Sequence, residues 1–109
     1  MSVLVFADSS EGKFKKSAFE VVSYGKKVAE QLGTAFTVVT INASEVSELY
    51  TYGAEKVLTV SNDQLRTFNA KGYTSVIQQA AAAENASVVV LDSSINVLHV
   101  APMLAVAMQ

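Results

Sequence analysis

The sequence predicts a three-layer α/β fold built on a doubly wound, Rossmann-like parallel sheet. Four short, continuous apolar runs alternate with segments of helical periodicity, in the order β-α-β-α-β-α-β-α. Strands that are apolar at successive positions are typical of parallel sheets whose two faces are both covered by helices. Right-handed crossover connections then favour a doubly wound layout. Because 109 residues is the size of one domain, we expect residues 1–109 to form a single α/β domain.

The first strand and the first helix have the clearest patterns. Residues 3–7 (VLVFA) are uniformly apolar and predict a buried strand. Apolar residues recur at helical spacing over residues 17–32, which predicts an amphipathic helix. Ser17 and Glu20 have the spacing of a capping box at its start, and Gly33 predicts its end. Between the strand and the helix, Glu11-Gly12 indicates a turn.

The next strand and helix form a second unit of the same kind. Residues 35–41 (AFTVVTI) are rich in β-branched and aromatic side chains, which predicts a strand. A short helix follows at about 45–52, with Asn42 or Ser44 as its expected N-cap. Gly53 then predicts its end.

The remaining segments complete the alternation. Residues 56–60 predict a third strand, and the polar segment 63–68 predicts a helical turn. The alanine-rich residues 74–84 predict a helix, and residues 87–91 predict a fourth buried strand. A last helix is expected from about 96 to 108.

Composition excludes several classes of function. Lysine and arginine total 8 against 10 acidic residues, for a net charge of -2, which disfavours a generic nucleic-acid binder. The absence of cysteine removes disulfides, thiolate zinc sites and iron–sulfur ligation. A single histidine, His99, allows no multi-histidine metal centre. We expect no metal-ligating residues.

The last third of the chain carries few charges. After Lys71 there is no basic residue, and the only acidic residues are Glu84 and Asp92. We therefore expect this part to be buried or covered by a partner. The segment 97–108 is too short to span a membrane, and no targeting signal is visible, so a cytoplasmic protein without membrane insertion is expected. No capping residue follows the last helix, which favours a longer parent protein of which this is the N-terminal piece.

Polar residues follow each predicted strand. In open parallel sheets, ligands bind beyond the carboxyl ends of the strands, at a topological switch point. The same small polar residues also suit helix N-caps and turns, and that interpretation is favoured here. The four segments are Asp8-Ser9-Ser10, Asn42-Ala43-Ser44, Ser61-Asn62-Asp63 and Asp92-Ser93-Ser94.

Neither a phosphate loop nor a catalytic constellation is evident. The patterns G-x-G-x-x-G and G-x-x-x-x-G-K-[ST] do not occur, and the first turn holds only Gly12, beside Asp8 and Glu11. His99 has no partner at the spacing of a triad, and we expect it to be a packing or surface residue. Asp8 and Asp92 could meet as paired carboxylates, although turn capping is favoured for both. We expect no catalytic and no cofactor-binding residues.

Three further groups are expected to be structural. The lysines at 13, 15 and 16, with Lys26 and Lys27, are interpreted as a solvated face, with an acidic partner or a phosphate as the alternative. Tyr50 and Tyr52 are interpreted as packing and edge residues. Met103 and Met108, with Leu104 and Val106, are expected to form core or the seam to a partner, and self-association through this region is expected. These four residues are expected to form one apolar surface.

The order of these motifs resembles the N-terminal domain of the electron transfer flavoprotein alpha subunit. The opening VLVFADSSEGKFKKSAFEVVSYGKKVAEQLG is similar to the start of that family, and residues 52–57 (YGAEKV) match its Tyr-Gly-Ala-(Asp/Glu)-Lys-Val motif. Strand 88–91, Ser93-Ser94 and Ala101-Pro102 fit its following block in outline. The chain departs from the family at 96–99 (NVLH), where a glycine followed by a basic and an acidic residue is common. It departs again at Met103, where the family often has arginine.

The resemblance implies an adenine-nucleotide-hydrolase-like fold and a heterodimeric flavoprotein. Such a protein carries electrons from acyl-CoA and other flavin dehydrogenases to a quinone oxidoreductase. It further implies that FAD is held mainly by a C-terminal domain absent from this chain, and that AMP is held by the partner beta subunit. The expected role of residues 1–109 is therefore scaffolding, without catalysis and without bound FAD. The alternative is an autonomous adenine-nucleotide-binding module of the universal-stress-protein type, with Asp8, Ser93 and Ser94 lining its cleft; a small hydrolase built on Asp8, Asp92 and His99 is a third, less favoured hypothesis.

Overall fold

A parallel sheet of four strands forms the centre of the molecule. The computed structural model describes residues 2–91. The strands lie side by side in the order β5-β4-β1-β6, and every neighbouring pair is parallel. Their bounds are β1 Ser2–Phe6, β4 Ala35–Ile41, β5 Val57–Val60 and β6 Ala86–Val90. The predicted strands are thus confirmed to within a residue or two at each end.

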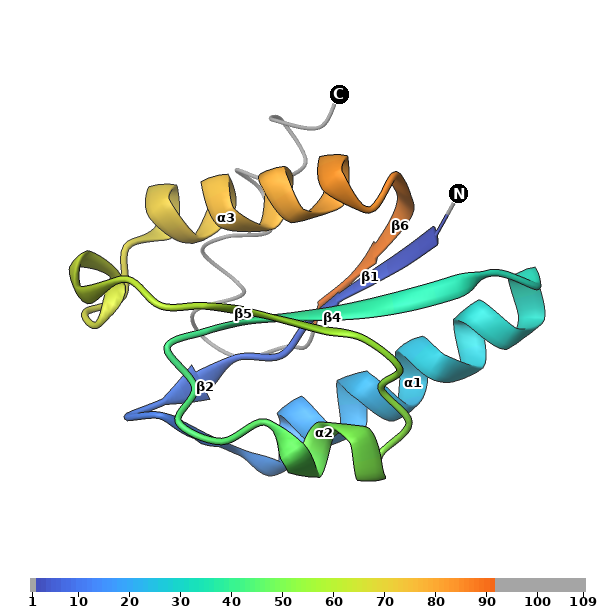
Figure 1. Ribbon diagram of the computed structural model, residues 1–109, viewed down its shortest axis with the longest axis horizontal. Helices are drawn as coiled ribbons and strands as arrows, with labels where there is room; N and C mark the ends of the chain where they lie inside the picture. Colours follow the sequence, from blue (N-terminus) through green and yellow to red (C-terminus); the bar gives the residue numbers. More distant parts are fainter. Residues whose placement is uncertain (1, 92–109) are drawn as a thin grey trace.

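Helices cover both faces of this sheet, which confirms the three-layer α/β prediction. Two helices, α1 (Lys16–Leu32) and α2 (Ser47–Thr51), lie on one face, and α3 (Ala70–Ala83) lies on the other (Figure 1). None of the helices within residues 2–91 has the length and apolar character needed to cross a bilayer. The expected helix at 96–108 lies outside the described residues.

The strands divide the core into two apolar clusters because their side chains alternate between the faces. Val3 and Val5 of β1 belong to the cluster under α1, together with Leu49 of α2. Leu4 and Phe6 belong to the cluster under α3. Every residue of β1 is buried, as expected for a central strand covered on both sides.

Helix α1 crosses the sheet closely because of one small residue. A Cβ atom added at Gly25 would overlap Cγ2 of Val5, so the helix backbone rests directly on β1. The helix ends as predicted at Gly33, which has φ 63° and donates from its backbone N to Glu30 O. The predicted capping box is wrong: the N-cap is Lys15, whose side chain makes no cap hydrogen bond. Glu20 instead lies 3.9 Å from Lys16 Nζ.

A short β-hairpin, with two residues in each strand, links β1 to α1. The sequence predicts only its turn and not its strands. Its strands are β2 (Ser9–Ser10) and β3 (Lys13–Phe14), which pair antiparallel. The turn between them was predicted, and both of its residues have positive φ, 53° at Glu11 and 80° at Gly12. Such a turn matches the natural twist of paired strands.

Two of the predicted helices have different bounds. Helix α2 is shorter than expected, and its N-cap is Val46 rather than Asn42 or Ser44. Asn42 is instead used to join two loops, as described below. Helix α3 begins at Ala70, four residues before the predicted start. The Asn69 side chain accepts a hydrogen bond from Gly72 N at 2.9 Å, which caps the helix there. The segment 63–68 contains a single 3-10 turn, Asp63–Leu65.

Candidate functional site

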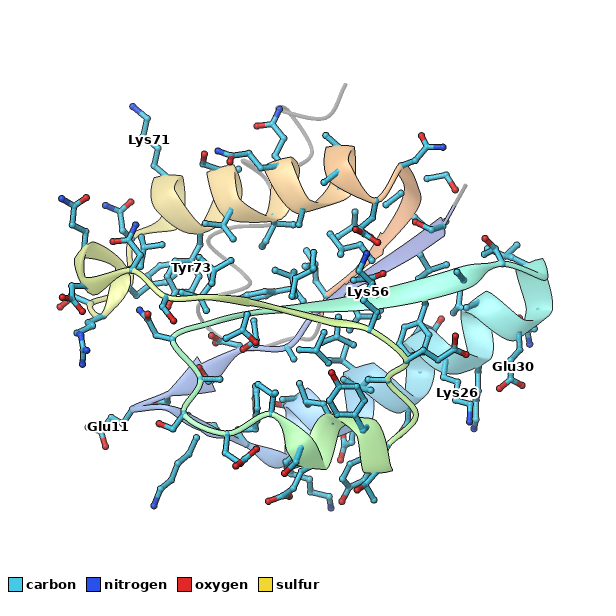
Figure 2. The ribbon with its side chains drawn as sticks, in the orientation of Figure 1. Glu11, Lys26, Glu30, Lys56, Lys71 and Tyr73 are labelled. Carbon is cyan, nitrogen blue, oxygen red and sulfur yellow. The ribbon has the colours of Figure 1, made fainter. Side chains whose placement is uncertain are left out.

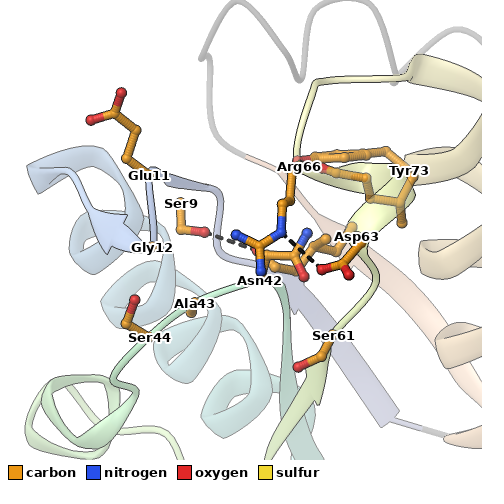
Figure 3. A pocket seen from close by; sticks show the side chains of 12 residues that line it. Ser9, Glu11, Gly12, Asn42, Ala43, Ser44, Ser61, Asp63, Arg66 and Tyr73 are labelled. Atoms are coloured by element: carbon orange, nitrogen blue, oxygen red, sulfur yellow. Dashed lines mark hydrogen bonds and ion pairs between the residues drawn. The ribbon is translucent and has the colours of Figure 1, made fainter.

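A cleft of about 590 Å³ opens at the carboxyl edge of β1, β4 and β5 (Figure 3). It is the edge at which open parallel sheets bind ligands. The cleft is lined by residues from the β2–β3 hairpin, the loops after β4 and β5, and the start of α3. These residues are Ser9, Glu11, Gly12, Ile41, Asn42, Ala43, Ser44, Ser61, Asp63, Leu65, Arg66 and Tyr73.

The cleft brings together residues from three of the four polar segments predicted at strand ends, those that follow β1, β4 and β5. The fourth, Asp92-Ser93-Ser94, lies outside the described residues, as does His99. The less favoured pairing of Asp8 with Asp92 is therefore not tested. In the strand order β5-β4-β1-β6, the topological switch point falls between β1 and β6, because the chain moves outward from β1 to β4 and β5 and then returns to the other side. The described cleft lies beside that point rather than over it.

The β2–β3 hairpin folds over the loop that follows β4. Ser9 Oγ donates a hydrogen bond to Ile41 O at 2.9 Å, and Ser44 N donates to Gly12 O at 2.9 Å. A Cβ atom added at Gly12 would overlap Oγ of Ser44. The space that this glycine leaves open is thus filled by protein. In a phosphate-binding loop, the equivalent space would admit the ligand.

The loops after β4 and β5 are joined by a pair of asparagines. Asn42 Nδ2 donates to Asn62 O, and Asn62 N donates to Asn42 Oδ1, both at 2.8 Å. Asn42 has a positive φ of 56°, which asparagine tolerates better than most residues. The Asn62 side chain also accepts from Gln64 N at 2.9 Å and caps the 3-10 turn. These polar groups therefore support turns and caps, which was the favoured interpretation from the sequence.

The charges around the cleft do not form an anion site. Arg66 is the one basic side chain in the lining, and its Nε lies 2.8 Å from Asp63 Oδ1 (Figure 3). Both side chains are largely exposed to solvent. Glu11 adds a second carboxylate at the rim. An incoming phosphate would meet more acidic than basic groups, and we conclude that the described lining does not fit the phosphate of AMP or the pyrophosphate of FAD.

Tyr73, near the start of α3, lines the cleft. Burial, and secondarily the nearby Asp8 carboxylate, raise the pKa of its hydroxyl above the ordinary value. The hydroxyl donates to Leu65 O at 3.4 Å, and the ring packs edge-on against Phe6 and Phe68. Tyr73 is therefore a packing residue with a satisfied donor, and sequence periodicity did not single it out.

The other predicted site residues are dispersed. The lysines at 13, 15, 16, 26 and 27 are exposed, as expected of a solvated face, and Lys26 Nζ lies 4.0 Å from Glu30 Oε1. Tyr52 is a packing residue, as expected, because it stacks on Phe19 with ring centroids 4.7 Å apart. The residues Met103, Leu104, Val106 and Met108 lie outside the described part. Within residues 2–91, no three histidine or acidic side chains are placed to hold a metal ion together.

The order of strands and the cleft at their carboxyl edge define a parallel α/β protein of nucleotide-hydrolase-like architecture. Comparison with known proteins gives the family. A family model described as the electron transfer flavoprotein domain matches residues 3–109. The chain belongs to the electron transfer flavoprotein family, as the sequence resemblance indicated.

Individual relatives agree with this assignment. The electron transfer flavoprotein subunit alpha of Clostridium acetobutylicum is 38% identical over 78 residues, which is 69% of this chain and 23% of the relative. The subunit alpha of Bacillus subtilis is 27% identical over 108 residues, 98% of this chain and 33% of the relative. The acryloyl-CoA reductase electron transfer subunit beta of Anaerotignum propionicum is 26% identical over 84% of the chain. The chain thus spans about a quarter to a third of the relatives it matches.

Proposed function

We propose that this chain is the N-terminal scaffold domain of an electron transfer flavoprotein alpha subunit. The observation that carries the proposal is the family match over residues 3–109, combined with coverage of only 23% to 33% of the alpha-subunit relatives. The chain accordingly contributes one α/β domain to a larger, cytoplasmic electron carrier. In that carrier, FAD moves electrons from flavin dehydrogenases toward a quinone oxidoreductase, and residues outside this chain hold the FAD.

The cleft supports a structural role for this domain. Its one glycine in the first turn packs on Ser44, its asparagines cap turns, and Arg66 is paired with Asp63. None of these groups is left to neutralise a phosphate. In a flavoprotein, the flavin supplies the redox chemistry, and the protein positions it. The contribution of this chain would be to hold a beta subunit and a flavin-binding domain in place, with AMP bound by the beta subunit.

The proposal is tested by mixing the purified chain with the beta subunit of the same organism and analysing the mixture by sedimentation velocity. We expect a complex of one chain and one beta subunit. The chain alone, incubated with AMP as a control, should keep its own sedimentation coefficient. A typical micromolar interface has a Kd of about 1 µM. Failure to associate at about 0.1 mM of each protein, about 100 times that Kd, would contradict a scaffold role.

A second candidate function is favoured by the cleft volume alone. About 590 Å³ at the carboxyl edge of the sheet is within the usual size of small-molecule sites. An adenine nucleotide held mainly by its base and ribose would need fewer phosphate contacts. Calorimetric titration of the chain with AMP and with ATP tests this candidate. Binding at about 1 µM or tighter would favour it over the scaffold role.

A further inference from the structure

A second hollow, of about 330 Å³, lies on the outer surface of α1. We call it the aromatic–lysine groove. It is formed on the solvent side of the α1–α2 layer, and none of its lining residues also lines the carboxyl-edge cleft. Its lining consists of Lys16, Phe19, Glu20, Ser23, Tyr24, Lys27 and Tyr52.

Aromatic rings pack against one another at the floor of the aromatic–lysine groove. The rings of Phe19 and Tyr52 are stacked, with an interplanar angle of 22°, and Phe14 packs edge-on against Phe19 at 6.0 Å. Gly53 has φ 113°, a conformation that side-chain-bearing residues rarely adopt, and lies beside the Lys26 side chain of α1. A partner that binds here would not have to order these rings first, which lowers the entropic cost of binding.

The groove exposes two tyrosine side chains to solvent. Tyr24 is 60% exposed and Tyr52 is 43% exposed, although both are large and apolar in their rings. Tyr50 of α2 is a further exposed aromatic residue in the same layer. Tyrosine presents much contact area at a low conformational cost and is enriched at the centres of protein interfaces.

Charge indicates which kind of partner fits. Lys16 and Lys27 flank the groove, and its one acidic lining residue, Glu20, lies 3.9 Å from Lys16 Nζ. Lys27 forms no ion pair with any other residue in the described range 2–91. The groove is therefore locally positive on a chain whose net charge is -2. Complementary charge steers association and selects acidic partners over basic ones.

We propose that the aromatic–lysine groove docks an acidic segment of a partner protein, with one aromatic side chain of that segment seated on the Phe19–Tyr52 stack. The carboxylates on either side of the anchor would meet Lys16 and Lys27. The inference rests on the proposed function, because it assigns a contact surface to a domain that works by holding partners. Two lysines and a net negative chain are too little to hold a nucleic-acid backbone, which needs several neutralising contacts.

The test uses the uniformly ¹⁵N-labelled 109-residue chain and a capped seven-residue peptide, in which a central phenylalanine is flanked by two acidic residues on each side. We expect saturable amide shifts in residues 16–27 and at Tyr52, with a Kd of about 1 mM or tighter. A peptide with alanine in place of phenylalanine, and one with amides in place of the carboxylates, should each bind at least about threefold more weakly.

Matched variants locate the interaction. Lys27→Glu should weaken binding about fivefold at low salt, because it replaces attraction by repulsion at the rim. Lys71→Glu makes the same change of charge on α3, across the sheet from the groove, and should have little effect (Figure 2). Tyr24→Ala removes exposed contact area without touching the core and should weaken binding about threefold.

No amide shifts at about 5 mM peptide, a concentration above the expected Kd, would overturn the inference. Shifts confined to the carboxyl-edge cleft would also overturn it. So would tighter binding of a single-stranded oligonucleotide than of the peptide. These outcomes are separate from failure of the proposed function, which would appear as lack of association with a beta subunit. If the chain does not bind the peptide, and the Lys27→Glu variant binds the beta subunit as tightly as the parent does, the scaffold role stands. The docking role of the aromatic–lysine groove is then refuted.

Discussion

Replacing Gly25 by alanine tests how closely α1 rests on the sheet. The added Cβ would overlap Cγ2 of Val5, a fully buried atom on the central strand, and would lie 3.8 Å from Cδ2 of Phe36. In an exposed helix, alanine is better than glycine by about 0.5–1 kcal/mol. Overpacking a well-filled core costs about 1–3 kcal/mol. The overlap is with a short, β-branched side chain that has little freedom to move. We therefore expect Gly25→Ala to lower the free energy of unfolding by about 1–2 kcal/mol.

The interaction with Val5 can be isolated by a double-mutant cycle. Val5→Ala alone should destabilise the protein by about 2 kcal/mol, because it leaves a small cavity. In the double variant, the new methyl group at position 25 would occupy part of that cavity. We expect the double variant to be at least as stable as Val5→Ala, which is a favourable coupling of about 1–2 kcal/mol. Gln31→Ala, on the exposed side of α1, is the control for helix propensity and should change stability by less than about 0.5 kcal/mol.

The assay is urea unfolding followed by far-ultraviolet circular dichroism, with the same transition slope required of all variants. Additive effects of Gly25→Ala and Val5→Ala, within about 0.5 kcal/mol, would refute the contact between α1 and β1. An increase in stability for Gly25→Ala alone would refute it as well, since helix propensity would then dominate and the space over Val5 would be open.

The contacts of Asn69, Glu84 and Gly12 can also be tested by substitution. Asn69→Ala should lower the free energy of unfolding by about 1 kcal/mol, because the Gly72 amide loses its hydrogen-bond acceptor. Asn69→Ser should keep most of the stability, because serine also caps helices. Thermal melts of both variants check this, and equal melting temperatures of Asn69→Ala and the parent would contradict the cap. The pKa of Glu84 is lowered from 4.5, first by the hydrogen bond from Lys56 Nζ and then by that from Thr37 Oγ1. A carboxylate with a lowered pKa stabilises the fold above its unfolded pKa, and this stabilisation is lost as the pH falls below about 4.5. Glu84→Gln should therefore flatten the decline of stability between about pH 5 and 3, measured by urea unfolding, and an unchanged pH slope would exclude the contribution of Glu84. Gly12→Ala should destabilise the protein by about 1–3 kcal/mol, through positive φ and the clash with Ser44, and an unchanged urea midpoint would show that the hairpin does not rest on the loop after β4.

The strands and the layers could be predicted because burial on both faces leaves a direct mark on the sequence. β1 is apolar at every position from Val3 to Phe6, and only a central strand of a covered sheet needs that pattern. The end of α1 was equally predictable, because Gly33 takes a left-handed conformation that favours glycine.

The errors arose where a side chain far along the chain, or a weak local signal, decides the outcome. α3 was placed too late because Lys71 and Gly72 interrupt the apolar pattern, although Asn69 caps the helix before them. Ser17 did not cap α1, because the hairpin carries the chain into the helix at Lys16. The hairpin strands are two residues each, which is too short to show alternation.

The candidate site was only partly predictable. The rule for parallel sheets placed the polar strand ends at one edge, and three of the four segments do meet there. The filling of that edge by the Ser44 side chain and by the Asn42–Asn62 pair depends on contacts between separate loops, which no local pattern encodes. The stack of Phe19 on Tyr52 joins α1 to the loop after α2 and escapes the sequence for the same reason.

Our proposal requires that this domain supports the flavin from outside and does not hold it. The most direct measurement is the visible absorbance of the chain after incubation with excess FAD and removal of free FAD by gel filtration. We expect a colourless protein without the visible absorbance of bound oxidised flavin. A yellow protein with flavin in stoichiometric amount would contradict it.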